Sequence, residues 1–273
     1  MSMLADRFYI TEVSSFLGLV KILKADPEFR LALDFGGKCL EFESLLMAGV
    51  VGVGIRLVAH QAQGGATHIV AASSMTRTDR ATLRLDSGAL LQAIVALNHV
   101  PYAHMSLSLH EEEDALCLYT YNSEHTTLGH ALIHTLTLED HDTDFLVTDE
   151  EKRPALAYDL GLTHPGALWK TYMQASTIDT IIRYDGKTQN VTWETNHQQT
   201  KIALYLPVAT SCRTDVRVCL LPAVMAVVRG VLQFTAKHNT TLSLSEDLPV
   251  RIFASLDTAG SFIRLYAGTK EDL

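Results

Sequence analysis

The feature that most constrains the fold is an order of elements that occurs twice along the 273-residue chain. In the first half, apolar residues recur at i, i+3, i+4 and i+7, the spacing of one helix face, which predicts a helix over Val13 to Lys24. Alternating apolar residues then predict several strands, and Asp86-Ser87 marks the N-cap of a second helix, Gly88 to Leu97. The second half repeats this order, with helices predicted from His164-Pro165 to Ser176 and from Pro222 to Lys237. Two helices among antiparallel strands, twice over, predict an α+β protein of two similar domains.

A charged segment separates the two halves. It begins with Glu139, contains the apolar island Phe145-Leu146-Val147 and ends at Pro154. Such non-periodic, charged segments are typical of linkers that run over a protein surface. We therefore predict an N-terminal domain over residues 1–138, a connecting linker over 139–154 and a C-terminal domain over 155–273, each domain of ordinary size.

Composition narrows the class of protein. Hydrophobic residues make up 47% of the chain and charged residues 19%, which is enough for full cores. The longest mostly apolar run, Leu45 to Ile55, is shorter than the about 20 residues that span a bilayer, so we expect no membrane segment. No secretory signal is visible at Met1 to Asp6. We expect an intracellular protein with four reduced cysteines, since none forms a zinc or redox pair: Cys39, Cys117, Cys212 and Cys219.

The sequence holds no motif that predicts catalysis. There is no P-loop, nucleophile elbow or metal-binding helix motif, so we expect neither an enzyme nor a cofactor. His130 and His134 are four apart, but the residues around them alternate like a strand, which favours structural histidines over a metal site. The acidic linker lacks a bidentate Glu at calcium-loop spacing. We interpret Trp169 and Trp193 as packing residues rather than base-stacking platforms.

Charge is unevenly distributed. The net charge of −9 argues against a protein that wraps nucleic acid over its whole surface. Yet the predicted helices are selectively basic, through Lys21, Lys24, Lys170, Arg229 and Lys237. Acidic residues lie instead in turns, in the linker and in the C-terminal tail. A local basic surface on an acidic body is one interpretation; ordinary solvated helix faces are the other.

The chain resembles the family of proliferating cell nuclear antigen (PCNA). The resemblance rests on the order of elements, the acidic linker with its apolar island, the segment Asp215 to Ile263 and the ending Gly260 to Asp272. It covers essentially the whole chain, as a pattern rather than as high identity. It implies α+β clamp domains with two helices each on antiparallel sheets, which assemble into a trimeric ring around duplex DNA. The implied function is a non-catalytic sliding clamp that tethers replication, repair or checkpoint proteins and is placed on DNA by a clamp loader.

The resemblance also implies three sets of site residues. Those facing phosphates independently of sequence would be Lys21, Lys24, Lys170, Arg229 and Lys237. Those at the sheet edges that pair with neighbouring subunits would be Ile133, Thr135, Thr137, Lys201, Ala203 and Tyr205. Those of a pocket for peptide motifs of polymerases, nucleases or ligases would be Phe42, Phe145, Leu146, Val147, Leu265, Tyr266 and Ala267.

Departures from the family pattern indicate a diverged member. The helix Gly88 to Leu97 has no basic residue, Gly268 stands where the family has proline, and the linker lacks the usual Leu-Gly-Ile-Pro. Residues 80–91 resemble the Rad-type subunit of the heterotrimeric DNA-damage checkpoint clamp. We favour such a nuclear subunit. The alternatives are a PCNA-like replicative processivity factor, cellular or viral, a herpes-like monomeric processivity factor, and an unrelated α+β enzyme with a dispersed site.

Overall fold

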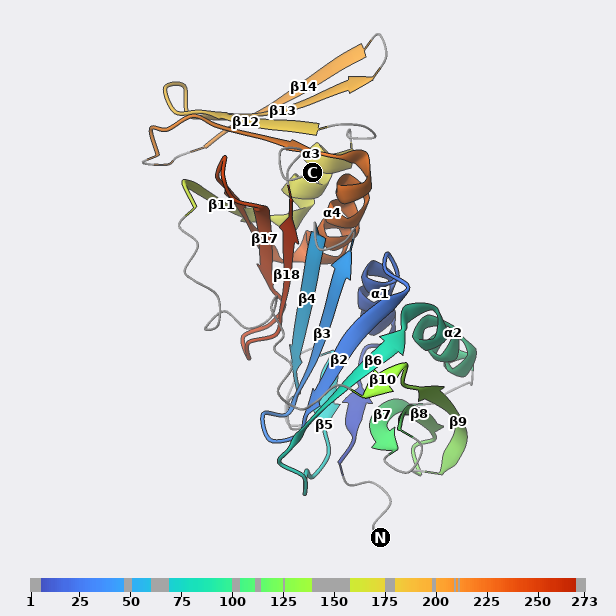
Figure 1. Ribbon diagram of the computed structural model, residues 1–273. Coiled ribbons are helices and arrows are strands. Elements are labelled where there is room, and N and C mark those ends of the chain that lie inside the picture. The colour runs from blue at the N-terminus through green and yellow to red at the C-terminus, as the bar shows by residue number, and fades with distance from the viewer. Residues whose placement is uncertain are drawn as a thin grey trace. The chain divides into compact units, whose positions relative to one another are not determined.

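The computed structural model describes residues 6–46, 51–59, 69–99, 104–110, 114–124, 126–138, 158–174, 180–197, 200–208, 210 and 212–268 (Figure 1). The chain divides into two compact units. Unit 1 comprises Met1–Ser44, Gly54–Thr148 and Asp257–Ser261, and unit 2 comprises Leu45–Val53, Asp149–Leu256 and Phe262–Leu273. The predicted linker, residues 139–154, lies outside the described residues.

Unit 1 contains two helices and most of the first ten strands. Its elements are β1 (Phe8–Ile10), α1 (Val13–Leu23), β2 (Glu28–Asp34), β3 (Cys39–Leu46), β4 (Val51–Val58), β5 (Val70–Ala72), β6 (Arg80–Asp86), α2 (Ser87–Asn98), β7 (His104–His110), β8 (Ala115–Tyr121), β9 (Thr127–His134) and β10 (Thr137–Leu138). The strands form two antiparallel arrangements, in the orders β5–β1–β7–β8–β9 and β10–β6–β2–β3–β4.

Unit 2 repeats the pattern with fewer strands. Its elements are β11 (Leu160–Pro165), α3 (Gly166–Gln174), β12 (Thr180–Asp185), β13 (Asn190–His197), β14 (Thr200–Pro207), β15 (Val216–Leu220), α4 (Pro222–Phe234), the 3-10 turn η3 (Thr235–Lys237), β16 (Asn239–Leu244), β17 (Val250–Ser255) and β18 (Phe262–Ala267). Their orders in the sheets are β11–β16–β17–β18 and β14–β13–β12–β15.

The strand orders reveal a structural duplication. β1–β7–β8–β9 of unit 1 corresponds to β11–β16–β17–β18 of unit 2, and β6–β2–β3–β4 corresponds to β15–β12–β13–β14. The helices correspond as α1 to α3 and α2 to α4. The repeated order of elements predicted from the sequence is therefore confirmed, because equivalent strands pair in the same order in both units.

The helices of unit 1 form where the sequence predicts them, α1 from its apolar spacing and α2 from its N-cap. α1 buries Phe16, Leu19 and Val20, and α2 buries Leu90 and Ile94. The Asp86 carboxylate caps α2 by accepting a hydrogen bond from the backbone N–H of Ala89 at 2.5 Å. The two helices pack side by side, and α2 also packs on β6, β8 and β9. Within the described residues no helix is long and apolar enough to cross a membrane.

In unit 2 the start of α3 differs from the prediction. Pro165 ends strand β11 instead of opening the helix, and Gly166 is the first helical residue. A Cβ at Gly166 would lie 2.1 Å from the Thr235 carbonyl oxygen, so only glycine permits this close approach of α3 to η3. Trp169 and Trp193 are both buried, with ring centroids 5.6 Å apart, which confirms their role in packing.

The stretch predicted as one strand, Ala131 to Leu138, is two strands. β9 ends at His134, and after a break at Thr135 and Leu136 the chain enters β10, whose Thr137 pairs with Arg84 of β6. The alternation of side chains continues across the break, so the sequence pattern alone does not reveal it.

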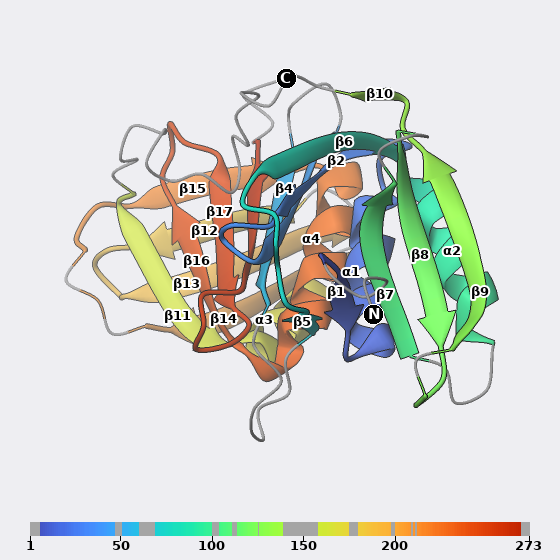
Figure 2. The ribbon, with the colours of Figure 1, turned by 90° about the horizontal axis from the view of Figure 1, so that it is seen from below.

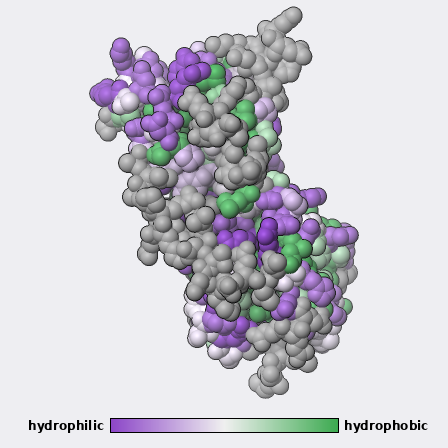
Figure 3. Space-filling view, in the orientation of Figure 1, coloured by the Kyte–Doolittle hydropathy of each residue, from purple (hydrophilic) through white to green (hydrophobic). Residues whose placement is uncertain are grey.

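Figure 3 shows that apolar areas on the visible face of the described residues are small and separated by hydrophilic ones.

Candidate nucleic-acid interface and subunit edges

The four α-helices of the described chain contain no Asp or Glu, although 31 of the 273 residues are acidic. Glu12 and Asp86 are the N-cap residues of α1 and α2, at the helix end where a carboxylate is stabilising. Helix surfaces free of carboxylates repel phosphate less than the rest of this acidic protein. The separation of acidic residues from the helices, which the sequence predicted, is thus present in the helices of the structure.

The basic residues of α1 occupy its exposed face. The buried positions of α1 face the core, whereas Ser14, Lys21 and Lys24 are exposed. Lys21 lies in the last turn, and Lys24 forms the C-cap, where cations also interact favourably with the helix dipole. These lysines therefore have an ordinary stabilising role in the helix, and their role toward phosphate stays a prediction.

The other three predicted basic residues are in unit 2. On α4 the exposed face runs through Ala226, Arg229, Gln233 and, beyond the helix, Lys237 in η3. Arg229 is half-buried and donates from Nε to the Met225 carbonyl oxygen at 3.3 Å, which holds its side chain along the helix. Lys170 of α3 is half-buried. α4 thus carries one half-buried cation, and the 3-10 turn that follows it carries an exposed one.

Strand β14 forms an edge of its sheet, and hydrogen bonding shows which backbone groups point outward. Val208 N–H donates to the Gln189 carbonyl at 2.9 Å, next to the register pair Asn190 and Pro207. Residues alternate between hydrogen-bonded and non-hydrogen-bonded pairs along antiparallel strands. The N–H and C=O groups that point away from β13 therefore belong to Lys201, Ala203 and Tyr205, three of the residues predicted to pair with a neighbouring subunit.

A side chain of the same unit already engages this edge. The Tyr172 hydroxyl of α3 donates to the Tyr205 carbonyl oxygen at 2.9 Å. The carbonyl has a second lone pair, so this bond still leaves an acceptor for another strand. The Tyr205 side chain is 66% exposed, the largest exposure among the large hydrophobic residues described.

Strand β9 is also an edge, but its outward residues differ from the predicted ones. Thr135 N–H donates to the Asp114 carbonyl at 3.0 Å, beside the register pair Ala115 and His134. The same alternation directs the backbone of Ile133 toward β8, and the Ile133 side chain is only 5% exposed. The backbone groups of Ile133 and Thr135 are therefore directed within the chain, and Thr137 pairs with Arg84 of β6. The backbone groups that point outward belong to His130, Leu132 and His134. The alternation of hydrogen-bonded and non-hydrogen-bonded residues identifies them once β9 is known to end at His134.

The described members of the predicted peptide pocket are buried. Phe42 packs with its ring centroid 5.9 Å from that of Phe16 and 6.1 Å from that of Phe29, in the core of unit 1. Leu265, Tyr266 and Ala267 follow one another on β18 and are all buried. The remaining three, Phe145, Leu146 and Val147, lie outside the described residues. The pocket itself stays a prediction.

Other polar clusters give no sign of a metal centre. In the part of the chain that the structure describes, no group of three or more His, Cys, Asp or Glu side chains is placed to hold a metal ion. His130 and His134 lie on strand β9, as the alternation around them predicts.

Two domains, each with two helices packed on antiparallel sheets, define the fold of the PCNA-type sliding clamps. Among solved structures, the chain is similar to PCNA from Entamoeba histolytica, with a TM-score of 0.71 and 16% identity over 98% of this chain and 100% of that one. It is similar to PCNA from Thermococcus kodakaraensis, with a TM-score of 0.69 and 10% identity over 97% and 99%. It is also similar to a chain of the PCNA2–PCNA3 complex from Sulfolobus tokodaii, with a TM-score of 0.68 and 9% identity over 97% and 99%.

Similarity in sequence does not accompany this similarity in structure. Neither a protein-family model nor any curated protein sequence matches the chain. The likeness therefore establishes the fold, at full length, in a sequence that shares little identity with these clamps.

Proposed function

We propose that the chain is a non-catalytic subunit of a DNA sliding clamp that encircles duplex DNA as part of a trimeric ring. The observation that carries this proposal is the segregation of charge on a clamp fold. The four described helices hold no carboxylate, and exposed basic residues stand on α1 and at the end of α4, in a protein of net charge −9. Contacts of lysine and arginine with phosphates are independent of base sequence, which suits a ring that slides.

Edge strands β9 and β14 provide for assembly. Each presents outward backbone groups on one side, from His130, Leu132 and His134 on β9 and from Lys201, Ala203 and Tyr205 on β14. An exposed edge is a template for pairing with another chain, and β9 of one subunit with β14 of the next makes a head-to-tail contact that closes a ring. Assembly from neighbouring subunits would cover both edges.

Within this class, a subunit of the heterotrimeric DNA-damage checkpoint clamp, acting in the nucleus, is favoured over a replicative processivity factor. α2 has no basic residue, so one of the four helix surfaces offers nothing to phosphate. The buried residue Gly268, in place of the family's proline, alters the tail of the partner pocket. Divergence of this kind suits a ring in which different chains share the contacts. Peptide motifs of polymerases, nucleases or ligases, and a clamp loader, are the expected partners.

Size-exclusion chromatography with light scattering separates the two versions. The checkpoint version predicts that the pure chain forms no stable self-trimer and assembles with two different partner chains that co-purify in equal amounts. A stable self-trimer would overturn the checkpoint version and support the replicative one. A chain that neither self-assembles nor co-purifies with clamp-like chains would contradict the clamp proposal.

A further inference from the structure

The outward face of the sheet in unit 1 has an unusual composition. Side chains on strands β1, β7, β8 and β9 alternate between the core and this face, and the registers between neighbouring strands align them in rows. One row holds Tyr9, Ser106, Tyr119 and His130, the next holds His104 and Tyr121, and the others hold Cys117 with Leu132 and His110 with His134. Figure 2 shows β7, β8 and β9 in front of α2, so this face lies opposite the helices.

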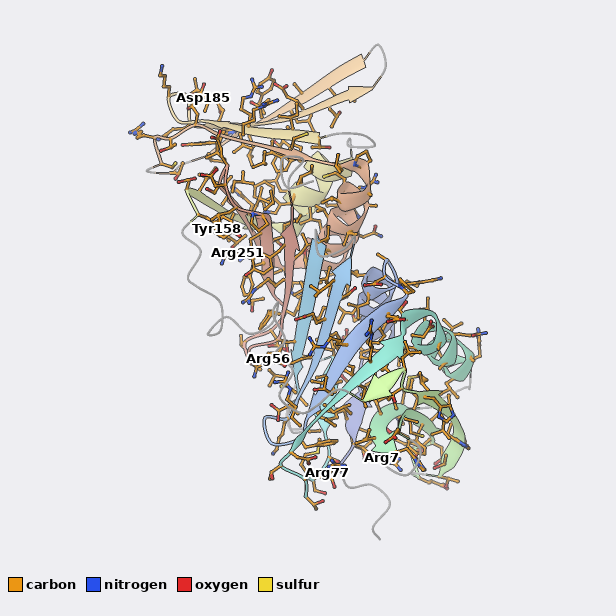
Figure 4. All side chains as sticks on the ribbon, in the orientation of Figure 1. Arg7, Arg56, Arg77, Tyr158, Asp185 and Arg251 are labelled. Carbon is orange, nitrogen blue, oxygen red and sulfur yellow. The ribbon has the colours of Figure 1, made fainter. Side chains whose placement is uncertain are left out.

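Rings on this face touch across neighbouring strands. The His104 and Tyr121 rings stack with centroids 5.5 Å apart, and Tyr9 meets Tyr121 edge-on at 5.7 Å. Tyr119 lies 6.3 Å from His130, and the Arg7 guanidinium lies 4.1 Å from the centre of the Tyr119 ring. His104 and His130 are exposed. Figure 4 labels Arg7 beside β7. The exposed imidazoles thus lie on a layer of tyrosines with a guanidinium within it.

The same face carries no negative charge among its described positions. None of the outward residues of β1, β7, β8 and β9 is Asp or Glu. In the sequence, Glu111, Glu112, Glu113 and Asp114 connect β7 to β8, and Glu124 follows β8. Burial raises the pKa of Tyr121, and a hydrogen bond with the Cys117 thiol raises the pKa of Tyr119, so both phenols stay neutral. In a protein of net charge −9, a face of this size without carboxylates is a local exception.

The duplicated unit shows that the fold does not require these histidines. The equivalent strands β11, β16, β17 and β18 present no histidine on their outward face in the described residues. Their positions hold Thr163, Thr241, Ser243, Arg251, Phe253, Phe262, Arg264 and Tyr266. Packing of the sheet therefore does not explain four imidazoles on one face of unit 1.

We propose that this face binds single-stranded nucleic acid, with bases stacking on His104 and His130 and phosphates pairing with Arg7. A flat sheet face with rings on adjacent strands and a nearby cation is the arrangement on which single-stranded bases stack. Nucleic acid is favoured over an acidic peptide, because a peptide carboxylate makes no use of stacked rings. The proposal goes beyond the clamp function and does not depend on it, since the face lies opposite the helices.

The groups that face His130 are Tyr119 and, above that ring, Arg7; the groups that face His104 are Tyr121 and, beside it, Tyr9.

The test is fluorescence anisotropy with a labelled oligo(dT) of about 15 nucleotides and the full chain at low salt. The double variant H104A/H130A should bind about tenfold or more weakly, because each stacked base loses its platform. H104F/H130F should retain binding, because the phenyl rings still provide stacking surfaces. The matched control His99→Ala removes an exposed histidine at the end of α2 and should change nothing.

Several results would overturn the proposal. The first is failure of the parent chain to bind oligo(dT) at low salt, and the second is parent-like affinity of H104A/H130A. The third is binding of a labelled oligo-glutamate peptide that is abolished in H104A/H130A while oligo(dT) is not bound. Failure of the clamp function is distinguishable, because K21A/K24A/R229A/K237A alters duplex retention and should leave oligo(dT) binding intact. Unchanged melting temperatures of all variants show that the fold is retained.

Discussion

The two units are built from the same order of elements but present different surfaces. α4 of unit 2 carries Arg229 and is followed by Lys237, whereas the equivalent α2 of unit 1 exposes Gln92, Val95 and Ala96 and has no charged residue. The outward sheet faces differ as well, with histidines in unit 1 and none among the described positions in unit 2. Because the scaffold is shared, these differences are not demands of folding and indicate separate roles for the two units.

The edges of the units also contrast, and proline substitution tests them. Ala203→Pro removes an N–H that points away from β13, so unit 2 should keep its fold while pairing with a neighbouring strand is abolished. We expect the assembly to dissociate into smaller species by light scattering. This is the largest effect that we predict.

Leu204→Pro is the matched control for that experiment. Leu204 pairs with Trp193 in the register of β13 and β14, and the alternation directs its N–H inward, so this proline should lower the melting temperature of the chain. If Ala203→Pro folds normally and assembly is unchanged, β14 is not the subunit edge.

The basic helix residues should account for retention on duplex DNA. Replacing Lys21, Lys24, Arg229 and Lys237 by alanine should weaken binding and flatten its dependence on salt, by about 0.9 in log–log slope for each phosphate that is no longer neutralised. Lys187→Ala removes an exposed lysine in the turn after β12 and serves as the control. An unchanged salt slope in the quadruple variant would mean that these side chains do not meet phosphate.

Charge can also be added to the uncharged helix. Gln92→Lys with Ala96→Lys places two cations four residues apart on the exposed side of α2, as on a basic helix face. If α2 faces DNA, the salt slope should steepen by about 1 to 2. Thr163→Lys adds a cation to the exposed position of β11, and it should have no such effect. An equal increase in salt slope from the α2 variant and from Thr163→Lys would contradict the proposal that the helices face DNA.

The smallest expected difference between the two units is in the reactivity of their cysteines. Cys39 and Cys117 of unit 1 are buried, whereas Cys212 and Cys219 of unit 2 are half-buried. Burial raises the pKa of the Cys39 thiol to about 12, so at pH values near 8 or 9 it stays a thiol and should not react. Mass spectrometry after brief alkylation of the native chain should find modification at Cys212 and Cys219 only. Rapid modification of Cys39 would show that unit 1 opens readily.

Sequence reasoning succeeded where the information is local. Apolar spacing located α1 and the N-cap Asp86-Ser87 located α2, each to within a few residues. Alternation placed His130 and His134 on a strand. The end of β9 was missed, since the alternation continues through the break before β10. The predicted edge residues Ile133, Thr135 and Thr137 were chosen from that longer strand, and the backbone groups of Ile133 and Thr135 are directed within the chain.

Pairing between distant segments could not be read from the sequence. His104 and His130 come from strands separated by β8, and only the register of the sheet brings them to one face. Phe42 was assigned to a pocket by resemblance, but its ring packs between Phe16 and Phe29 in the core. Such contacts depend on which strands pair, which residue types alone do not determine.

The most direct test of the clamp account is retention on DNA of different topology. The assembly that contains this chain, purified with its co-purifying partners, would be loaded onto nicked circular DNA and washed at high salt. A ring predicts that it stays on the circular DNA, because salt screens phosphate contacts but does not open a topological link. It also predicts that cutting the DNA once releases the protein from the ends. Equal loss from circular and linear DNA, or retention after cutting, would contradict encirclement.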